Sequence, residues 1–242
     1  MRECPRCQLR FRLPKDRPAA SRRFYQEGYR AGFTTSCPDR DALAAMLACG
    51  FKGSERDYGA YCDVLRAFGV PTGAVVLDFG SSWGYGSWQL ARAGYEVLSY
   101  EVSDSRARFA RERLGCTTIA DPRARGRSVD CLFASHVLEH LGDPGEFWDV
   151  AEAVLRPQGT VVCFVPNGDR ALEASYGRRT YDKLWGQVHP LLLNGQALAA
   201  MAGRRGFSAR VYSSPYAAAR IAAGAVDDSL PGGELALLAR RT

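Results

Sequence analysis

The sequence predicts an α/β protein in which helices cover both faces of a mostly parallel sheet. From residue 74 onward, short apolar runs alternate with helical patterns, and glycines separate many of them. The runs are hydrophobic throughout rather than at every second position, which is typical of buried parallel strands. The chain of 242 residues, 46% of them hydrophobic, is long enough for one large domain with a packed core.

The elements before this region differ in character. Residues 1–36 contain a Cys-x-x-Cys pair, several prolines and many arginines, and we expect them to form an appendage. Residues 37–70 form a helical lead-in with two predicted helices. Asp39 can cap the first helix, and a capping box that begins at Ser54 can open the second. The segment "GVPTG" then breaks the chain.

In residues 71–242, strands and helices alternate. The predicted strands of the first part cover residues 74–79, 96–101, 116–120, 129–134 and 159–165. The helices between them cover residues 84–94, 103–115 and 143–155. A further helix at 194–206 precedes two strands, at 207–215 and 233–241. No helix is evident directly before the last strand, so we expect this pair to be antiparallel.

Charge and composition narrow the classes of protein. The formal charge is +6, nearly all of it from arginine, and arginine clusters can serve phosphate contacts or simply a solvated face. No apolar run reaches the roughly 20 residues of a membrane span, and the first residues do not resemble a signal peptide. The eight cysteines are scattered rather than arranged as a disulfide framework. We expect a cytoplasmic protein without membrane contact or a nucleic-acid partner.

The glycine-rich stretch "VVLDFGSSWGYGSW" follows the first strand, where open α/β sheets bind their ligands. Its spacing is not the dinucleotide pattern G-x-G-x-x-G, which disfavours a nicotinamide-dependent oxidoreductase. Asp78 precedes the first glycine by two positions, and Glu101 closes the second strand. Carboxylates accept hydrogen bonds from ammonium groups and ribose hydroxyls, so the pattern predicts a cationic nucleoside ligand.

Four motifs, in order, resemble class I S-adenosylmethionine-dependent methyltransferases from about residue 75 to residue 240. They are "LDFGSSWGYGS", "YEVS", "VDCLFASHVLEHLGDP" and "VLRPQGTVVCFVPN". The resemblance implies a Rossmann-like fold with a mostly parallel seven-stranded sheet, an antiparallel last strand and helices on both faces. It also implies S-adenosyl-L-methionine as the methyl donor.

The resemblance further implies a set of donor-binding residues after the carboxyl ends of the first four strands. They are Asp78, Gly80, Ser82, Gly84, Glu101, Asp121, Ser135 and His136. Residues of the glycine-rich turn would line the methionine part of the donor, Glu101 would bind the ribose, and Asp121 would face the adenine amine. Ser82 stands where such motifs usually have a glycine.

Two features of the appendage leave alternatives open. The pair Cys4 and Cys7 resembles the second knuckle of a zinc ribbon that precedes some methyltransferases, but a structural zinc needs four ligands. The pair can instead be a remnant or a redox-sensitive dithiol. Tyr25 and Tyr29 fall on one helical face, and by resemblance they would close over the donor. The alternative is an amphipathic stripe that packs on the sheet.

Two of the three histidines lie in "SHVLEH", at His136 and His140, with Glu139 between them. On a helix these three residues would share one face, and His189, after the fifth strand, can reach the same edge. The group can bind a divalent metal, as related E-x-x-E-H methyltransferases do, or supply a general base, or be structural only. As a base we favour His136 or His189 over His140.

We therefore predict a methyltransferase that acts on a small-molecule or sugar acceptor, at a hydroxyl group, in a biosynthetic pathway. The alternatives are a nucleic-acid or protein methyltransferase, which the arginine excess would suit, and a donor-binding protein without catalysis. The sequence leaves open the identity of the acceptor and the oligomeric state.

Overall fold

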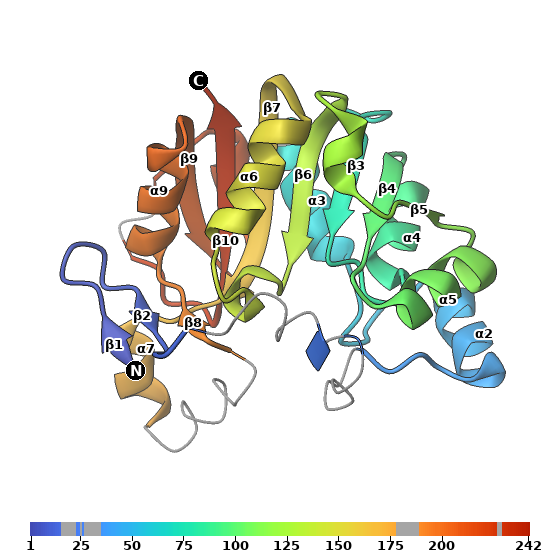
Figure 1. The fold of residues 1–242 in the computed structure, drawn as a ribbon, viewed down its shortest axis with the longest axis horizontal. Helices are drawn as coiled ribbons and strands as arrows, with labels where there is room; N and C mark the ends of the chain where they lie inside the picture. The colour runs from blue at the N-terminus through green and yellow to red at the C-terminus, as the bar shows by residue number, and fades with distance from the viewer. Residues whose placement is uncertain (16–22, 25, 27–34, 178–188, 227–228) are drawn as a thin grey trace.

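The computed structural model describes the chain except residues 16–22, 25, 27–34, 178–188 and 227–228. Seven strands form one sheet in the order β5-β4-β3-β6-β7-β10-β9 (Figure 1). They are β3 (Val75–Phe79), β4 (Glu96–Tyr100), β5 (Thr117–Thr118), β6 (Val129–Ser135), β7 (Leu155–Pro166), β9 (Phe207–Ser213) and β10 (Glu234–Arg241).

The strand directions confirm the predicted fold class. β3 pairs in parallel with both β4 and β6, and β6 pairs in parallel with β7, whereas β10 is antiparallel to its neighbours β7 and β9. The carboxyl ends of the parallel strands therefore lie together at the lower edge of the sheet in Figure 1, where β10 has its amino end. Below, we call this the carboxyl edge. The chain order reverses at β3, which makes this edge the expected ligand site.

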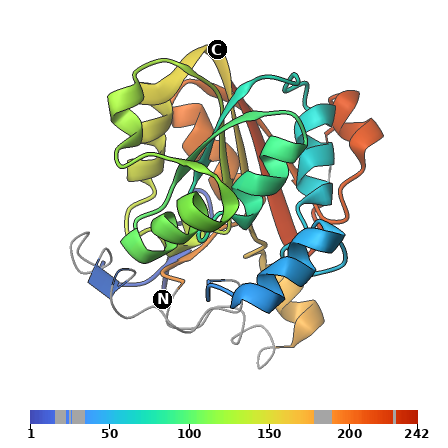
Figure 2. The same ribbon diagram turned by 90° about the vertical axis from the view of Figure 1, so that its right-hand side faces the viewer.

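Helices pack on both faces of the sheet, as the two views show (Figures 1 and 2). On one face, α6 (Gly145–Val154) and α9 (Gly195–Arg204) bury apolar side chains against the strands. The second core includes α2 (Arg40–Cys49), α3 (Gly59–Ala67), α4 (Tyr85–Arg92), α5 (Asp104–Leu114) and α10 (Ala218–Ala222). Neighbouring residues of β3, β6 and β7 alternate between the two cores, as the two-residue period of a strand requires.

A small antiparallel sheet ties the N-terminus to a later segment. It consists of β1 (Arg2–Glu3), β2 (Arg10–Phe11) and β8 (Leu191–Leu192), and it lies at the lower left of Figure 1 near α7 (Arg170–Tyr176). The Cys4-x-x-Cys7 segment forms the turn between β1 and β2, and the Cys4 N–H donates to the Leu9 carbonyl. Arg10 forms an ion pair with Glu173 of α7 at 2.8 Å.

Some predicted element boundaries differ from the structure. Helix α3 begins at Gly59 rather than directly after Ser54, because the Ser54 hydroxyl accepts a bond from the Arg56 N–H within a preceding turn. The predicted capping box is therefore wrong, and it is Asp57 that accepts the first N–H of the helix. In the described part of the chain, no helix is long and apolar enough to cross a membrane.

Candidate functional site

The glycine-rich turn connects β3 to α4 at the carboxyl edge. The N–H groups of Gly80 and Ser81 both donate to the Tyr100 carbonyl at the end of β4, which fixes the turn against the neighbouring strand. Gly80 has φ +82°, and a Cβ there would lie 2.5 Å from the Val137 side chain. The turn thus requires glycine at this position for both backbone conformation and space.

Ser82 occupies the position where the sequence departs from the usual glycine. Its φ is +52°, a left-handed conformation that costs about 1 kcal/mol or more for a residue with a Cβ. Its N–H donates to Glu101 Oε2 at 3.0 Å. Its buried hydroxyl has no hydrogen-bond partner among the described residues. The preference for glycine therefore has a conformational cause, and the serine places an extra polar atom in the turn.

Glu101 follows β4 and is buried. Its Oε1 accepts from the Ser103 N–H at 2.8 Å and from the Arg106 side chain, with which it forms an ion pair at 3.1 Å. Its Oε2 accepts the Ser82 N–H. A carboxylate offers about four acceptor positions, so the remaining capacity of Glu101 lies mainly on Oε2. The proposed ribose contact of Glu101 accordingly involves that oxygen.

A groove of about 470 Å³ runs along the carboxyl ends of β4 and β5, and Glu101, Arg108 and Ala120 help to line it. This volume suits a nucleoside-sized ligand. Asp121, the predicted adenine contact, follows Ala120 directly, but it is exposed and its Oδ1 accepts the Arg123 N–H at the start of η2 (Pro122–Arg125). The structure thus places the Asp121 backbone next to the groove while its side chain caps a short helix.

Asp78 at the end of β3 is almost fully buried and accepts the Ser87 hydroxyl at 2.6 Å. The Ser87 hydroxyl also contacts Ser99 Oγ at 3.1 Å, and Ser99 donates to Ser81 at 2.7 Å. Burial raises the pKa of Asp78 to about 7, which the Ser87 hydrogen bond partly offsets and the charge of Glu101 reinforces. The turn is therefore held by a carboxyl group that titrates near neutral pH.

Replacing Asp78 with asparagine is expected to remove a pH-dependent destabilisation. Between pH 4 and 7 the unfolded Asp78 ionises while the folded one keeps its proton, so its contribution to the free energy of unfolding falls as pH rises, by on the order of 4 kcal/mol. The free energy of unfolding of Asp78→Asn, minus that of the parent, should therefore increase from pH 4 to pH 8. Urea unfolding of the donor-free protein measures this, with the exposed Asp63→Asn as control. Parallel pH profiles for Asp78→Asn and the parent would refute the assignment.

A second group of side chains lies at the carboxyl edge around Glu234, the first residue of β10. Glu234 Oε2 contacts His136 Nε2 at 2.7 Å and accepts the Tyr61 hydroxyl at 2.6 Å, and Oε1 accepts the Tyr216 hydroxyl at 2.6 Å. We call these four residues the Glu234 cluster. They come from the segment after β6, from α3, from the segment after β9, and from the start of β10. The complete fold is therefore needed to assemble them.

The charges of this cluster are coupled. His136 has φ +54° directly after β6, and its ring lies between Glu234 and Glu139, whose Oε1 is 3.3 Å from His136 Nδ1. Loss of water contacts lowers the pKa of His136, but the two carboxylates outweigh this and raise it above neutrality. Burial and the Glu234 carboxylate raise the pKa of Tyr61 and Tyr216. The Glu234 carboxylate thus accepts hydrogen bonds from three side chains. When His136 is protonated, it donates one of these bonds and does not act as the predicted base.

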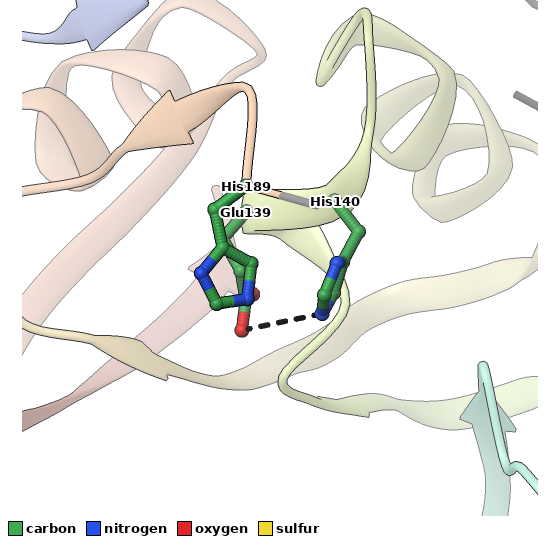
Figure 3. A group of neighbouring side chains, drawn as sticks. All are labelled: Glu139, His140 and His189. Atoms are coloured by element: carbon green, nitrogen blue, oxygen red, sulfur yellow. Dashed lines mark ion pairs between the residues drawn. The ribbon is translucent and has the colours of Figure 1, made fainter. Parts of the chain in front are cut away.

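The histidines converge at the carboxyl edge, as the sequence suggests, but not on an α-helix. The segment after β6 forms one turn of 3-10 helix, η3 (Leu138–His140), and His136 lies before it in a left-handed conformation. The prediction of a shared helical face is therefore wrong. His140 Nε2 lies 4.0 Å from Glu139 Oε1, and the His140 and His189 rings are 4.5 Å apart between centroids (Figure 3).

Sequence reasoning found His136 but missed the other three residues of the Glu234 cluster. Tyr61 belongs to the second predicted helix, Tyr216 follows the strand predicted at 207–215, and Glu234 lies in the strand predicted at 233–241. The usable signal for Glu234 is its position: the first residue of an antiparallel last strand must lie at the carboxyl edge of the parallel strands. Tyr25 and Tyr29, the predicted lid residues, lie outside the described residues, whereas Ser135 ends β6 beside His136.

Comparison with known proteins bears on the family and the fold of the chain. A family model described as a methyltransferase domain matches residues 54–210, more than half of the chain. A protein of Cereibacter sphaeroides named ubiquinone biosynthesis O-methyltransferase is 30% identical over 104 residues, which are 39% of this chain and 42% of that protein. The chain spans between 31% and 42% of the length of the curated relatives it matches.

Solved structures share the fold. A S-adenosylmethionine-dependent methyltransferase from Mesorhizobium loti matches with a TM-score of 0.56 and 22% identity over 77% of this chain and 100% of that chain. The plantazolicin methyltransferase BpumL, solved with a pentazolic desmethylPZN analogue and SAH, matches with a TM-score of 0.55 and 12% identity. It covers 84% of this chain and 92% of its own. At these identities the similarity concerns the fold.

Proposed function

The chain belongs to this methyltransferase domain family and uses S-adenosylmethionine as its methyl donor, and on that premise we propose that its acceptor is a hydroxyl group of a small molecule. The observation that carries the proposal is the Glu234 cluster. It presents carboxylate, imidazole and phenol groups at the same edge as the glycine-rich turn. Such groups orient a hydroxyl-bearing substrate by hydrogen bonds.

Methyl transfer from a sulfonium is an in-line displacement. A carbon–oxygen bond forms as the carbon–sulfur bond breaks, and the sulfur leaves as a neutral thioether, so the protein must align the acceptor and help to remove its proton. In our proposal, His136 and the rest of the Glu234 cluster position the acceptor. Glu139 and His140 on the adjoining turn, with His189 from the segment before β8, are the groups that assist proton removal.

Two further observations support a small acceptor. The C. sphaeroides relative carries the name of an O-methyltransferase, although it matches over only part of its length. The side chains described at the edge include the carboxylates of Asp78, Glu101, Glu139 and Glu234. Glu101 lies beside Arg106, and Glu139 and Glu234 lie beside His136, so the edge holds compact paired charges that suit a small polar acceptor rather than the broad basic surface on which nucleic-acid binding relies.

Matched acceptors test the proposal. We expect the purified protein to form S-adenosylhomocysteine with a phenol, catechol or sugar, at a rate at least about tenfold above that with the corresponding amine, because positioning and proton removal together contribute such factors. Mass spectrometry of the product should place the methyl group on oxygen. Turnover with transfer RNA, a protein or the amine, and none with the hydroxyl acceptors, would reject it.

A further inference from the structure

Three metal-ligating side chains meet on the turn after β6. The donor atoms of Glu139, His140 and His189 all lie within 4.8 Å of one another, and this is the one such group that the described residues contain. Figure 3 shows the carboxylate and the two rings directed toward a common point. We propose that these three residues, the Glu139 triad, bind one divalent transition-metal ion.

The Glu139 carboxylate provides independent support for a ligand. Only 1% of its side-chain surface is exposed, and neither of its oxygens accepts a hydrogen bond from a described residue. Two histidine nitrogens lie nearby, His136 Nδ1 at 3.3 Å and His140 Nε2 at 4.0 Å from Glu139 Oε1. A buried carboxylate ordinarily accepts several hydrogen bonds or coordinates a metal, because an unsatisfied buried charge is costly. An ion would use lone pairs that the fold leaves unused.

The donor types indicate which ions fit. Two imidazole nitrogens and one carboxylate oxygen are the ligand set of open zinc sites, whereas magnesium and calcium prefer oxygen ligands. Tetrahedral bonds of about 2.0–2.2 Å place donor atoms roughly 3.3 Å apart, so the atoms of the triad must approach by at most roughly 1.5 Å. His140 and His189 are both partly exposed, and rotation of their rings can supply this movement.

The role of the ion rests on the proposed function. With three protein ligands, a fourth position is open for the acceptor hydroxyl, and a divalent cation lowers the pKa of an oxygen bound to it. The hydroxyl proton then passes to water, and the anionic oxygen attacks the donor's methyl group. The carbon–sulfur electron pair stays on sulfur and the ion keeps its charge, so no oxidant or reductant is required.

Cobalt(II) is a suitable probe because its visible absorption reports coordination directly. The protein, stripped with EDTA, should carry Cys4→Ser and Cys7→Ser so that thiolates of that pair do not compete for the metal. We expect one cobalt ion to bind per chain, with the visible bands of a nitrogen and oxygen site. His189→Ala and His140→Ala should each weaken binding by at least tenfold, because each removes one of three ligands.

His136→Asn is the matched control, because it removes a histidine of the same segment that lies outside the triad. It should bind cobalt about as tightly as the parent, since all three ligands of the triad remain. Absence of cobalt binding, a thiolate charge-transfer band, or binding by both triad variants as tight as by the parent would overturn the inference. On the same proteins, calorimetry measures the binding of S-adenosylhomocysteine, and an activity assay measures turnover of the hydroxyl acceptors. These two results distinguish failure of the metal site from failure of the proposed function. Circular dichroism verifies that each variant is folded.

Discussion

Replacing Gly80 with alanine is expected to weaken donor binding by at least about 100-fold, or about 2.7 kcal/mol. The added Cβ would lie 2.5 Å from the Val137 side chain, in a backbone conformation with φ +82°. The turn must then shift away from β6, and this displaces Ser82 from its bond with Glu101. Calorimetry with S-adenosylhomocysteine measures the affinity.

Gly73 provides a matched control for this variant. It also has φ +82°, but a Cβ there would meet nothing within 4 Å, and it lies before β3, at the opposite end of the strand. Gly73→Ala should therefore cost only the backbone strain, about 1–2 kcal/mol of stability, and leave donor affinity unchanged. Adding Val137→Ala to Gly80→Ala should restore part of the affinity. Equal affinities for the Gly80 and Gly73 variants would exclude the turn as the donor site.

Replacing Glu234 with alanine is expected to be strongly destabilising and to lower kcat/KM by at least about 100-fold. The change leaves the partly buried hydroxyls of Tyr61 and Tyr216 and the His136 ring without their shared acceptor. His136 is 44% exposed, so the cost comes mainly from the two unsatisfied hydroxyls, at about 1–3 kcal/mol each. Chemical unfolding measures the stability, and the rate of S-adenosylhomocysteine formation measures the activity.

Glu234→Gln separates the two effects. The amide keeps an oxygen that can accept a tyrosine hydroxyl, so stability should recover in part, whereas the negative charge beside His136 is lost. We expect the activity of Glu234→Gln to stay low and its KM to rise, because the cluster orients the acceptor. Asp63→Ala, which removes an exposed ion pair with Arg66, should change stability by about 1 kcal/mol or less. Full activity of Glu234→Gln would contradict a positioning role.

The sequence predicted most of the sheet because its signals are local. Continuous apolar runs, separated by helices and glycines, specify β3, β4, β6 and β7, and the missing helix before the last strand predicted its antiparallel direction. The direction was predicted correctly, but its premise was not fully met, because the short helix α10 lies between β9 and β10. Strand boundaries were less accurate: β5 has only two residues, and β7 begins at Leu155, directly after α6.

The Glu234 cluster could not be predicted in the same way because it depends on pairing between distant strands. Glu234 reaches His136 only because β10 pairs with β7 in a register that sets Glu234 against Pro166. The left-handed conformations of Ser82 and His136 are likewise set by the turns around them, since φ above zero is uncommon for any residue other than glycine. Local patterns located the segments of the site, and tertiary contacts determined which side chains meet.

The most direct test of the central claim, that the donor's methyl group faces the Glu234 cluster, is a crystal structure with S-adenosylhomocysteine. We predict that the ribose binds Glu101 Oε2 in the groove beside β4 and β5 and that the sulfur faces His136 and Glu234. A nucleoside bound outside this groove, or a sulfur directed away from the cluster, would contradict the claim.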